Sequence, residues 1–168
     1  MFVRNQSVTR RAIPALVVVV VLLLALAMPA MAAMERPFRA SFEGLAGFAE
    51  PRCGSDVTLG FAAIGTATHL GRMEGEASNC SDPAFPVAAV DVRDGVITLV
   101  AADGSTITAE YEGVQEAPVD GVAPYLLTMT VVGGTGRFER ASGSWTASGL
   151  LDFNDLTISG AFDGWIAY

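Results

Sequence analysis

The chain lacks lysine, and its cations are few. All ten basic side chains among its 168 residues are arginines, set against 18 acids, for a formal charge of −8 at neutral pH. Three of these arginines, at positions 4, 10 and 11, precede residue 33, so removal of the N-terminus would change −8 to −11. Because such a surface repels phosphate backbones, the composition argues against nucleic-acid binding.

Groups that commonly carry catalysis or bind metals are also scarce. His69 is the only histidine, and no nucleophile motif accompanies it, so we expect it to hydrogen-bond at a bend and predict no metal or other cofactor. A glycine pair at 134 and 136 resembles part of a dinucleotide loop. However, Glu139 occupies the position of the last glycine, and the surrounding sequence predicts strands, so we exclude this function.

The two cysteines, Cys53 and Cys80, do not have the C-x-x-C spacing of redox or metal pairs. Two cysteines in an exported chain most often form one disulfide, so we predict a Cys53–Cys80 bond. A redox or metal-binding pair is the alternative.

The N-terminus has the pattern of a secretory signal peptide. Arg4, Arg10 and Arg11 precede an uncharged run from Ala12 to Met28, and Ala30-Met31-Ala32 fits a cleavage site. We predict a signal peptide over 1–32 and a secreted or cell-envelope location. The alternative is an uncleaved anchor, which would be the protein's only contact with a membrane.

The rest of the chain, 36–168, reads as one domain of short strands with alternating apolar residues. Arg93-Asp94-Gly95 and Asp103-Gly104 are hairpin signals, and Gly113–Pro124 is expected to be the longest loop. The expected strands number eight or nine and cover 38–43, 57–68, 72–80, 87–92, 96–101, 106–112, 125–132, 144–153 and 156–168. This pattern predicts an all-β fold, a single antiparallel up-and-down β-barrel of about eight strands.

A glycine-rich corner is the most informative stretch. Glycines at 133, 134 and 136 permit a tight turn, and the Arg137–Ala141 segment is long enough for one helical turn with Phe138 as a plug. We expect this corner to close one end of the barrel.

The same corner carries a family resemblance. Gly-Gly-Thr-Gly-Arg-Phe from Gly133, followed by Ala141-Ser142-Gly143, resembles the allene oxide cyclase barrel-like group of secreted bacterial proteins, a calycin-type and dirigent-related group. Further similar segments are Thr68–Arg72, Ala101–Ser105 and Phe162–Tyr168. The resemblance spans residues 36 to 168 and implies a barrel.

Candidate ligand-binding residues are aromatic, apolar and acidic side chains of the expected strands. Aromatic side chains could line an apolar cavity, and the paired carboxylates could serve acid–base chemistry if buried; a filled core and a solvated strand face are the alternatives. The candidates are Tyr111, Met129, Trp145, Phe153, Glu110 and Glu112.

The function we expect is non-enzymatic: an exported barrel that binds a small apolar ligand or acts at the cell envelope. Two alternatives follow from the resemblance, a cofactor-free isomerase or cyclase of the allene oxide cyclase type and a dirigent-like orienting protein. No catalytic residue is assigned, and the sequence leaves the oligomeric state open.

Overall fold

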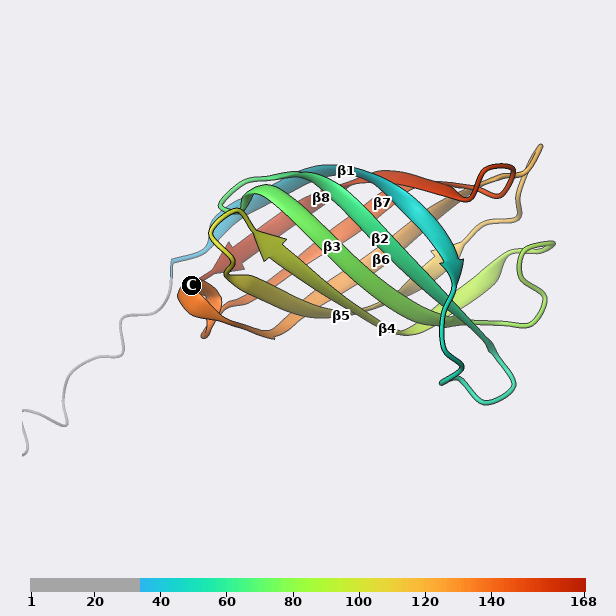
Figure 1. The fold of residues 1–168 in the computed structure, drawn as a ribbon, viewed down its shortest axis with the longest axis horizontal. Coiled ribbons are helices and arrows are strands. Elements are labelled where there is room, and N and C mark those ends of the chain that lie inside the picture. Colours follow the sequence, from blue (N-terminus) through green and yellow to red (C-terminus); the bar gives the residue numbers. More distant parts are fainter. Residues whose placement is uncertain (1–33) are drawn as a thin grey trace, which may run out of the picture. The chain divides into compact units, whose positions relative to one another are not determined.

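Residues 34–168 are described by a computed structural model and form a closed barrel of eight antiparallel strands (Figure 1). Each strand pairs with the next in sequence, and β8 pairs with β1. The strands are β1 (Arg36–Phe48), β2 (Val57–Ala67), β3 (Gly71–Ser81), β4 (Val90–Ala101), β5 (Thr106–Gln115), β6 (Val122–Gly134), β7 (Ser142–Asp152) and β8 (Thr157–Ala167). The predicted all-β barrel is therefore confirmed, whereas the predicted signal segment, 1–32, lies outside the described residues. No helix within 34–168 is long and apolar enough to cross a bilayer.

Side-chain alternation decides what the barrel encloses. In β5, Ile107, Ala109 and Tyr111 are buried, while Glu110 and Glu112 are exposed. Successive side chains of a strand point to opposite faces, so the apolar set fills the interior and the acids cover the outside. Burial of the apolar face, which the pattern favoured, is confirmed.

The two ends of the barrel differ in their connections. We call one end the base; it holds the short connections 68–70, 102–105 and 135–141, the start of β1 and the end of β8. The other end, the mouth, holds the loops 49–56, 82–89, 116–121 and 153–156. In Figure 1 the base is the end that carries the C label.

The glycine-rich corner closes the base, as its sequence predicts. Gly136 has a φ of +59° and opens a single 3₁₀ turn, Gly136–Phe138, that directs the fully buried Phe138 ring into the barrel. Above it, the Phe38 and Trp145 rings lie 4.5 Å apart, and the indole Nε1 of Trp145 donates a hydrogen bond of 2.9 Å to the sulfur of Met129. The base half of the barrel is a packed core.

The hairpin predicted at Arg93-Asp94-Gly95 is wrong. These residues form an irregularity within the single strand β4, where the register with β5 shifts between Val92 and Gly95 and Asp94 has a φ of +50°. Residues on both sides of the shift continue to pair with β5, so the chain bulges instead of reversing. The loop predicted from Gly113 to Pro124 shortens to 116–121, because β5 extends to Gln115 and β6 begins at Val122. It is therefore not the longest loop, since the connections 49–56 and 82–89 are longer.

Candidate functional site

The mouth-side half of the barrel contains a cavity. Its volume is about 70 Å³, and twenty inward-facing residues from all eight strands line it, most of them apolar. This volume is several times what one water molecule needs but well below the ~300–1,000 Å³ of sites for drug-sized ligands. The cavity therefore has room for a small molecule.

Glycines on β7 and β8 make room for one wall of this cavity. Gly149 and Gly160 are cross-strand partners, and the hydroxyl of Tyr125 lies against both of them. A Cβ at either glycine would collide with that hydroxyl. The Tyr125 hydroxyl donates a hydrogen bond of 3.0 Å to the carbonyl oxygen of Ser159, so the ring is fixed across the β7–β8 pair.

A short chain of polar groups crosses the opposite wall. The hydroxyl of Tyr111 donates to Oδ1 of Asn79 over 3.1 Å, and Nδ2 of Asn79 donates to the hydroxyl of Ser81 over 3.0 Å. All three side chains are buried. Loss of solvation through burial raises the pKa of Tyr111, and likewise that of Tyr125, well above the usual tyrosine range. Both phenols are neutral hydrogen-bonding groups at physiological pH.

One polar group in the wall has no partner. Gln115 is the last residue of β5 and only 4% exposed, and its Nε2 is the one buried side-chain nitrogen or oxygen in 34–168 without a hydrogen bond. A buried donor that forms no hydrogen bond costs about 1–3 kcal/mol. Unpaired buried polar groups are rare in native proteins, so this amide in the wall of a cavity calls for a physical explanation.

The cavity is lined by uncharged side chains only. None of its lining residues is Asp, Glu, Arg or His, and the described part of the chain contains no cluster of three metal-binding side chains. A charged ligand group placed here would lose its hydration without meeting an opposite charge, which is strongly unfavourable. The cavity suits an uncharged molecule.

Two aromatic side chains meet at the mouth. Phe85 in the loop 82–89 and Phe153 in the loop 153–156 pack edge to face with their ring centroids 5.2 Å apart. These loops follow β3 and β7, which lie on opposite sides of an eight-stranded barrel, so the pair bridges the mouth. Both rings pack against the core and are only partly buried.

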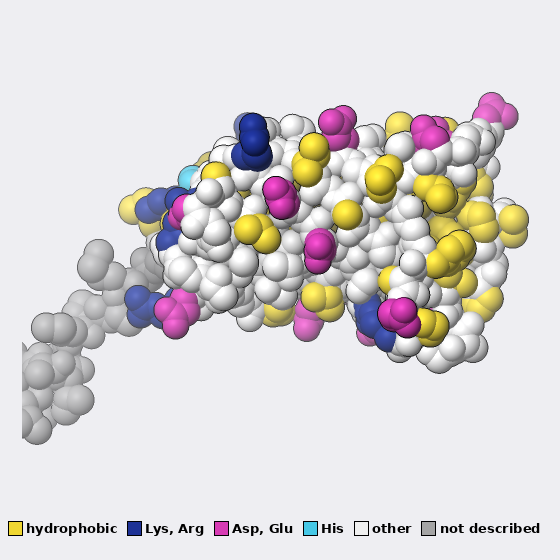
Figure 2. All heavy atoms as spheres, in the orientation of Figure 1, with side chains coloured by type: hydrophobic (Ala, Val, Ile, Leu, Met, Phe, Trp, Pro, Cys, Tyr) yellow, Lys and Arg dark blue, Asp and Glu magenta, His cyan; other side chains and the backbone are white. Residues whose placement is uncertain are grey.

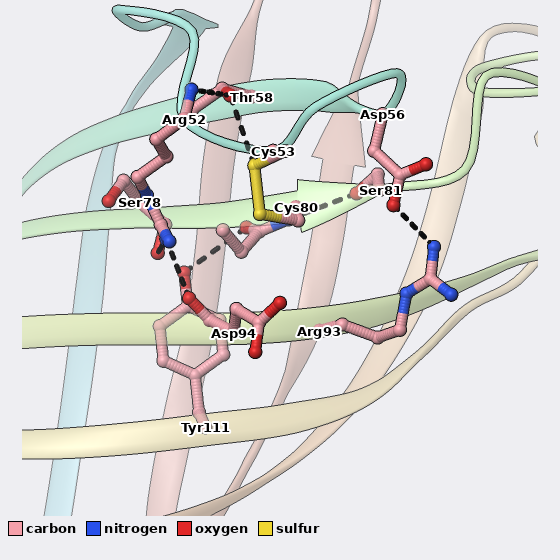
Figure 3. The surroundings of a disulfide bond; sticks show 11 residues. Arg52, Cys53, Asp56, Thr58, Ser78, Cys80, Ser81, Arg93, Asp94 and Tyr111 are labelled. Carbon is pink, nitrogen blue, oxygen red and sulfur yellow. Dashed lines mark hydrogen bonds and ion pairs between the residues drawn. A yellow bond between two sulfur atoms is a disulfide. The ribbon is translucent and has the colours of Figure 1, made fainter.

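The Cys53–Cys80 disulfide, which the sequence predicted, ties the loop 49–56 to β3 (Figure 3). Arg52 adds hydrogen bonds from Nη2 to the carbonyl oxygens of Ser78, at 3.1 Å, and Asp94, at 2.6 Å. The bulge in β4 presents the Asp94 carbonyl to this arginine (Figure 3). The loop beside the cavity is thereby held in place by both covalent and polar contacts.

The outer surface of the mouth is rich in exposed apolar side chains. Each of its four strand-to-strand connections, or the strand end beside it, exposes a large one: Phe48, Val87, Val119 and Leu156. On the face shown in Figure 2, hydrophobic side chains gather toward this end. Ion pairs lie at both ends: Arg137–Asp103 and Arg39–Asp163 at the base, and Arg93–Asp56 at the mouth.

The candidate residues chosen from the sequence fall into three places. Tyr111 and Met129 line the cavity. Trp145 lies in the packed base half, and Phe153 belongs to the aromatic pair at the mouth. Glu110 and Glu112 are exposed on the outside of β5, so the structure does not bring these carboxylates to the cavity. His69 lies at a base connection with a φ of +70°, and its Nε2 is 3.0 Å from the carbonyl oxygen of Pro37, as expected for a residue that hydrogen-bonds at a bend.

Two polar residues of the site, Asn79 and Gln115, are absent from the candidates chosen by sequence. The signal that could have found them is the alternation of inward and outward side chains along a strand. Asn79 follows Met73, Gly75 and Ala77 at steps of two, and Gln115 follows Tyr111 and Gly113 in the same way.

Comparison with known proteins adds no family assignment. The chain matches no protein-family model, and no curated protein is significantly similar to it.

Proposed function

We propose that the protein is an exported, non-enzymatic barrel that binds a small apolar molecule in the mouth-side half of its interior. The observation that carries this proposal is the contrast within one barrel: large side chains fill the base half, whereas an apolar-walled cavity of about 70 Å³ occupies the mouth side. An eight-stranded barrel is just wide enough either to fill with side chains or to hold one small ligand.

Two further features support the proposal. The Cys53–Cys80 bond is consistent with an oxidising, extracytoplasmic compartment. The resemblance of the glycine-rich corner to allene oxide cyclase barrel-like proteins points to a barrel used outside the cytoplasm. The cyclase alternative gains no support from the site, because that chemistry would direct a carboxylate at the substrate and Glu110 and Glu112 face solvent.

The first experiment is native mass spectrometry of the protein purified from its own cell envelope, followed by organic extraction. We expect a reproducible small-molecule adduct that is lost on denaturation. A bare mass, together with no uptake of xenon measured by ¹²⁹Xe NMR, would contradict the proposal, because a dry apolar cavity takes up xenon.

A pair of matched substitutions then locates the bound molecule. Ala77 lines the cavity, and Ala62 lies on the outer face of the neighbouring strand β2, so the same change to leucine fills the cavity in one case and adds surface in the other. We expect Ala77→Leu to weaken xenon binding at least tenfold and Ala62→Leu to leave it within twofold of the wild type. Equal binding by all three proteins would place the xenon elsewhere.

A further inference from the structure

The side-chain amide of Gln115 is the one polar feature of the cavity that the fold does not use. The hydroxyl of Tyr125 donates its hydrogen bond to the carbonyl oxygen of Ser159. Tyr111, Asn79 and Ser81 are joined to one another by hydrogen bonds. Gln115 Nε2 has no partner although its side chain is 96% buried. Folding alone would favour an apolar residue at this position, since a buried donor without an acceptor lowers stability.

The amide has a defined place in the cavity. Gln115 ends β5, between its cross-strand partners Val90 and Tyr125, and belongs to the cavity lining. The alternation that points Tyr111 inward also points Gln115 inward, four residues nearer the mouth. The residue therefore lies at the mouth-side end of the apolar space, where the polar end of a small molecule can meet it.

The charge of the lining restricts that polar end. No acidic or basic side chain of the described residues contributes to the cavity wall, so a carboxylate, phosphate or ammonium group would be buried without a counter-charge. A donor such as Nε2 requires an acceptor, and an uncharged oxygen meets both conditions.

We infer that the ligand is a neutral molecule with an apolar body and a hydrogen-bond-accepting oxygen, as in a ketone, ester or ether, and that this oxygen binds the side-chain amide of Gln115. This inference rests on the proposed function. It assigns Gln115 as the specificity-determining residue, with the apolar walls holding the body of the ligand.

Three small probes with the same planar framework of four non-hydrogen atoms test the inference: isobutene, acetone and acetate. Their dissociation constants are measured by NMR titration for the wild type and for Gln115→Met, which keeps the length of the side chain and removes its hydrogen bonds. The ratio of the acetone to the isobutene constant is expected to rise about tenfold in the variant. The hydration of each probe cancels when this ratio is compared between the two proteins.

A control and a second readout keep this test decisive. In Glu112→Met, the same replacement on the outer face of β5, the ratio should stay within twofold of the wild type, because Glu112 does not line the cavity. Without ligand, Gln115→Met should raise the melting temperature by a few degrees, since an unpaired buried donor is removed. Acetate should bind neither protein at neutral pH.

The outcomes separate the two claims. If neither neutral probe binds the wild type, the proposed function fails. If both bind but the ratio is the same in Gln115→Met, if Glu112→Met shifts it equally, or if acetate binds tightest, the cavity stands and the role of Gln115 is refuted. A lower melting temperature of the ligand-free Gln115→Met variant would show that the amide is already satisfied, and would also refute the inference.

Discussion

The base and the mouth half of this barrel are made from the same eight strands but are filled in different ways. Below the middle of the barrel, Phe38, Trp145 and Phe138 occupy the interior with almost no exposed surface. Toward the mouth, Ala77 and Gly75 stand where larger residues would be needed to fill the same cross-section, and a cavity remains. Close packing is thus concentrated at one end, and the cavity lies toward the other.

Polar groups follow the same division. The base is sealed by the connection 135–141, whose apolar Phe138 side chain points inward and whose Arg137 forms an ion pair outside with Asp103 of the connection 102–105. The mouth half buries Asn79, Gln115 and two tyrosines instead. Because each buried polar group costs free energy unless it is paired, the mouth half has lower intrinsic stability and depends on its hydrogen bonds and its disulfide.

Truncation of a base aromatic should have the largest effect. Trp145→Ala removes a 2%-exposed indole that packs on Phe38 and Phe162, and we expect it to lower the free energy of unfolding by about 3–5 kcal/mol. Phe61→Ala, in the cavity wall, should cost less than half as much, because Phe61 is only half-buried. Urea unfolding of the two variants measures the difference. Equal losses would show that the mouth half is packed as tightly as the base.

Much of this architecture follows from local sequence. The alternation of Ile107, Ala109 and Tyr111 predicts a strand with one apolar face, and the glycines before Phe138 predict the tight connection that directs the ring inward. Both signals lie within a few residues, so they do not depend on the rest of the fold. The strand count was close to correct for the same reason.

The error in β4 shows where local sequence is insufficient. Asp94-Gly95 is compatible with both a hairpin and a bulge, because either places Asp94 at positive φ. The choice is made by pairing on both sides of the irregularity with β3 and β5, which are distant partners.

The prediction of the site residues was partly wrong for a simpler reason. Tyr111 and Glu110 are adjacent in one strand and must point to opposite faces, so both could not line one cavity. Gln115 was assigned to a loop because Gly113 weakened the strand signal; the pairing of Gln115 with Val90 and Tyr125 shows that β5 continues. That an amide would remain unpaired depends on the complete interior and has no local signature.

Loss of the disulfide should affect the mouth half most. Replacing both Cys53 and Cys80 with alanine frees a loop closed over a sequence separation of 27 and should lower the free energy of unfolding by about 3 kcal/mol. Hydrogen exchange should rise first at the mouth-side ends of β2 and β3 while base amides remain protected. Exchange that rises equally at both ends would contradict the division of the barrel into two unequal halves.

The smallest expected effect is a loss of stability at alkaline pH, and it originates in the mouth half. Burial raises the pKa of Tyr111 and Tyr125 in the folded protein, whereas in the unfolded chain tyrosine titrates near its usual value of about 10. Above that pH the unfolded chain loses protons that the folded barrel retains, so stability is complete below pH ~10 and falls as the pH rises.

Each of these two phenols should cost about 0.8 kcal/mol of unfolding free energy at pH 10.5. Urea unfolding at pH 8 and pH 10.5 measures this decline in unfolding free energy, and Tyr111→Phe should reduce the decline by about half. The variant should also be less stable than the wild type at both pH values, because Oδ1 of Asn79 loses the hydrogen bond that Tyr111 donates. An unchanged decline in Tyr111→Phe would mean that this hydroxyl ionises as readily in the barrel as in the unfolded chain. The mouth half would then be open to water, and the neutral apolar cavity on which the proposed function rests would be excluded.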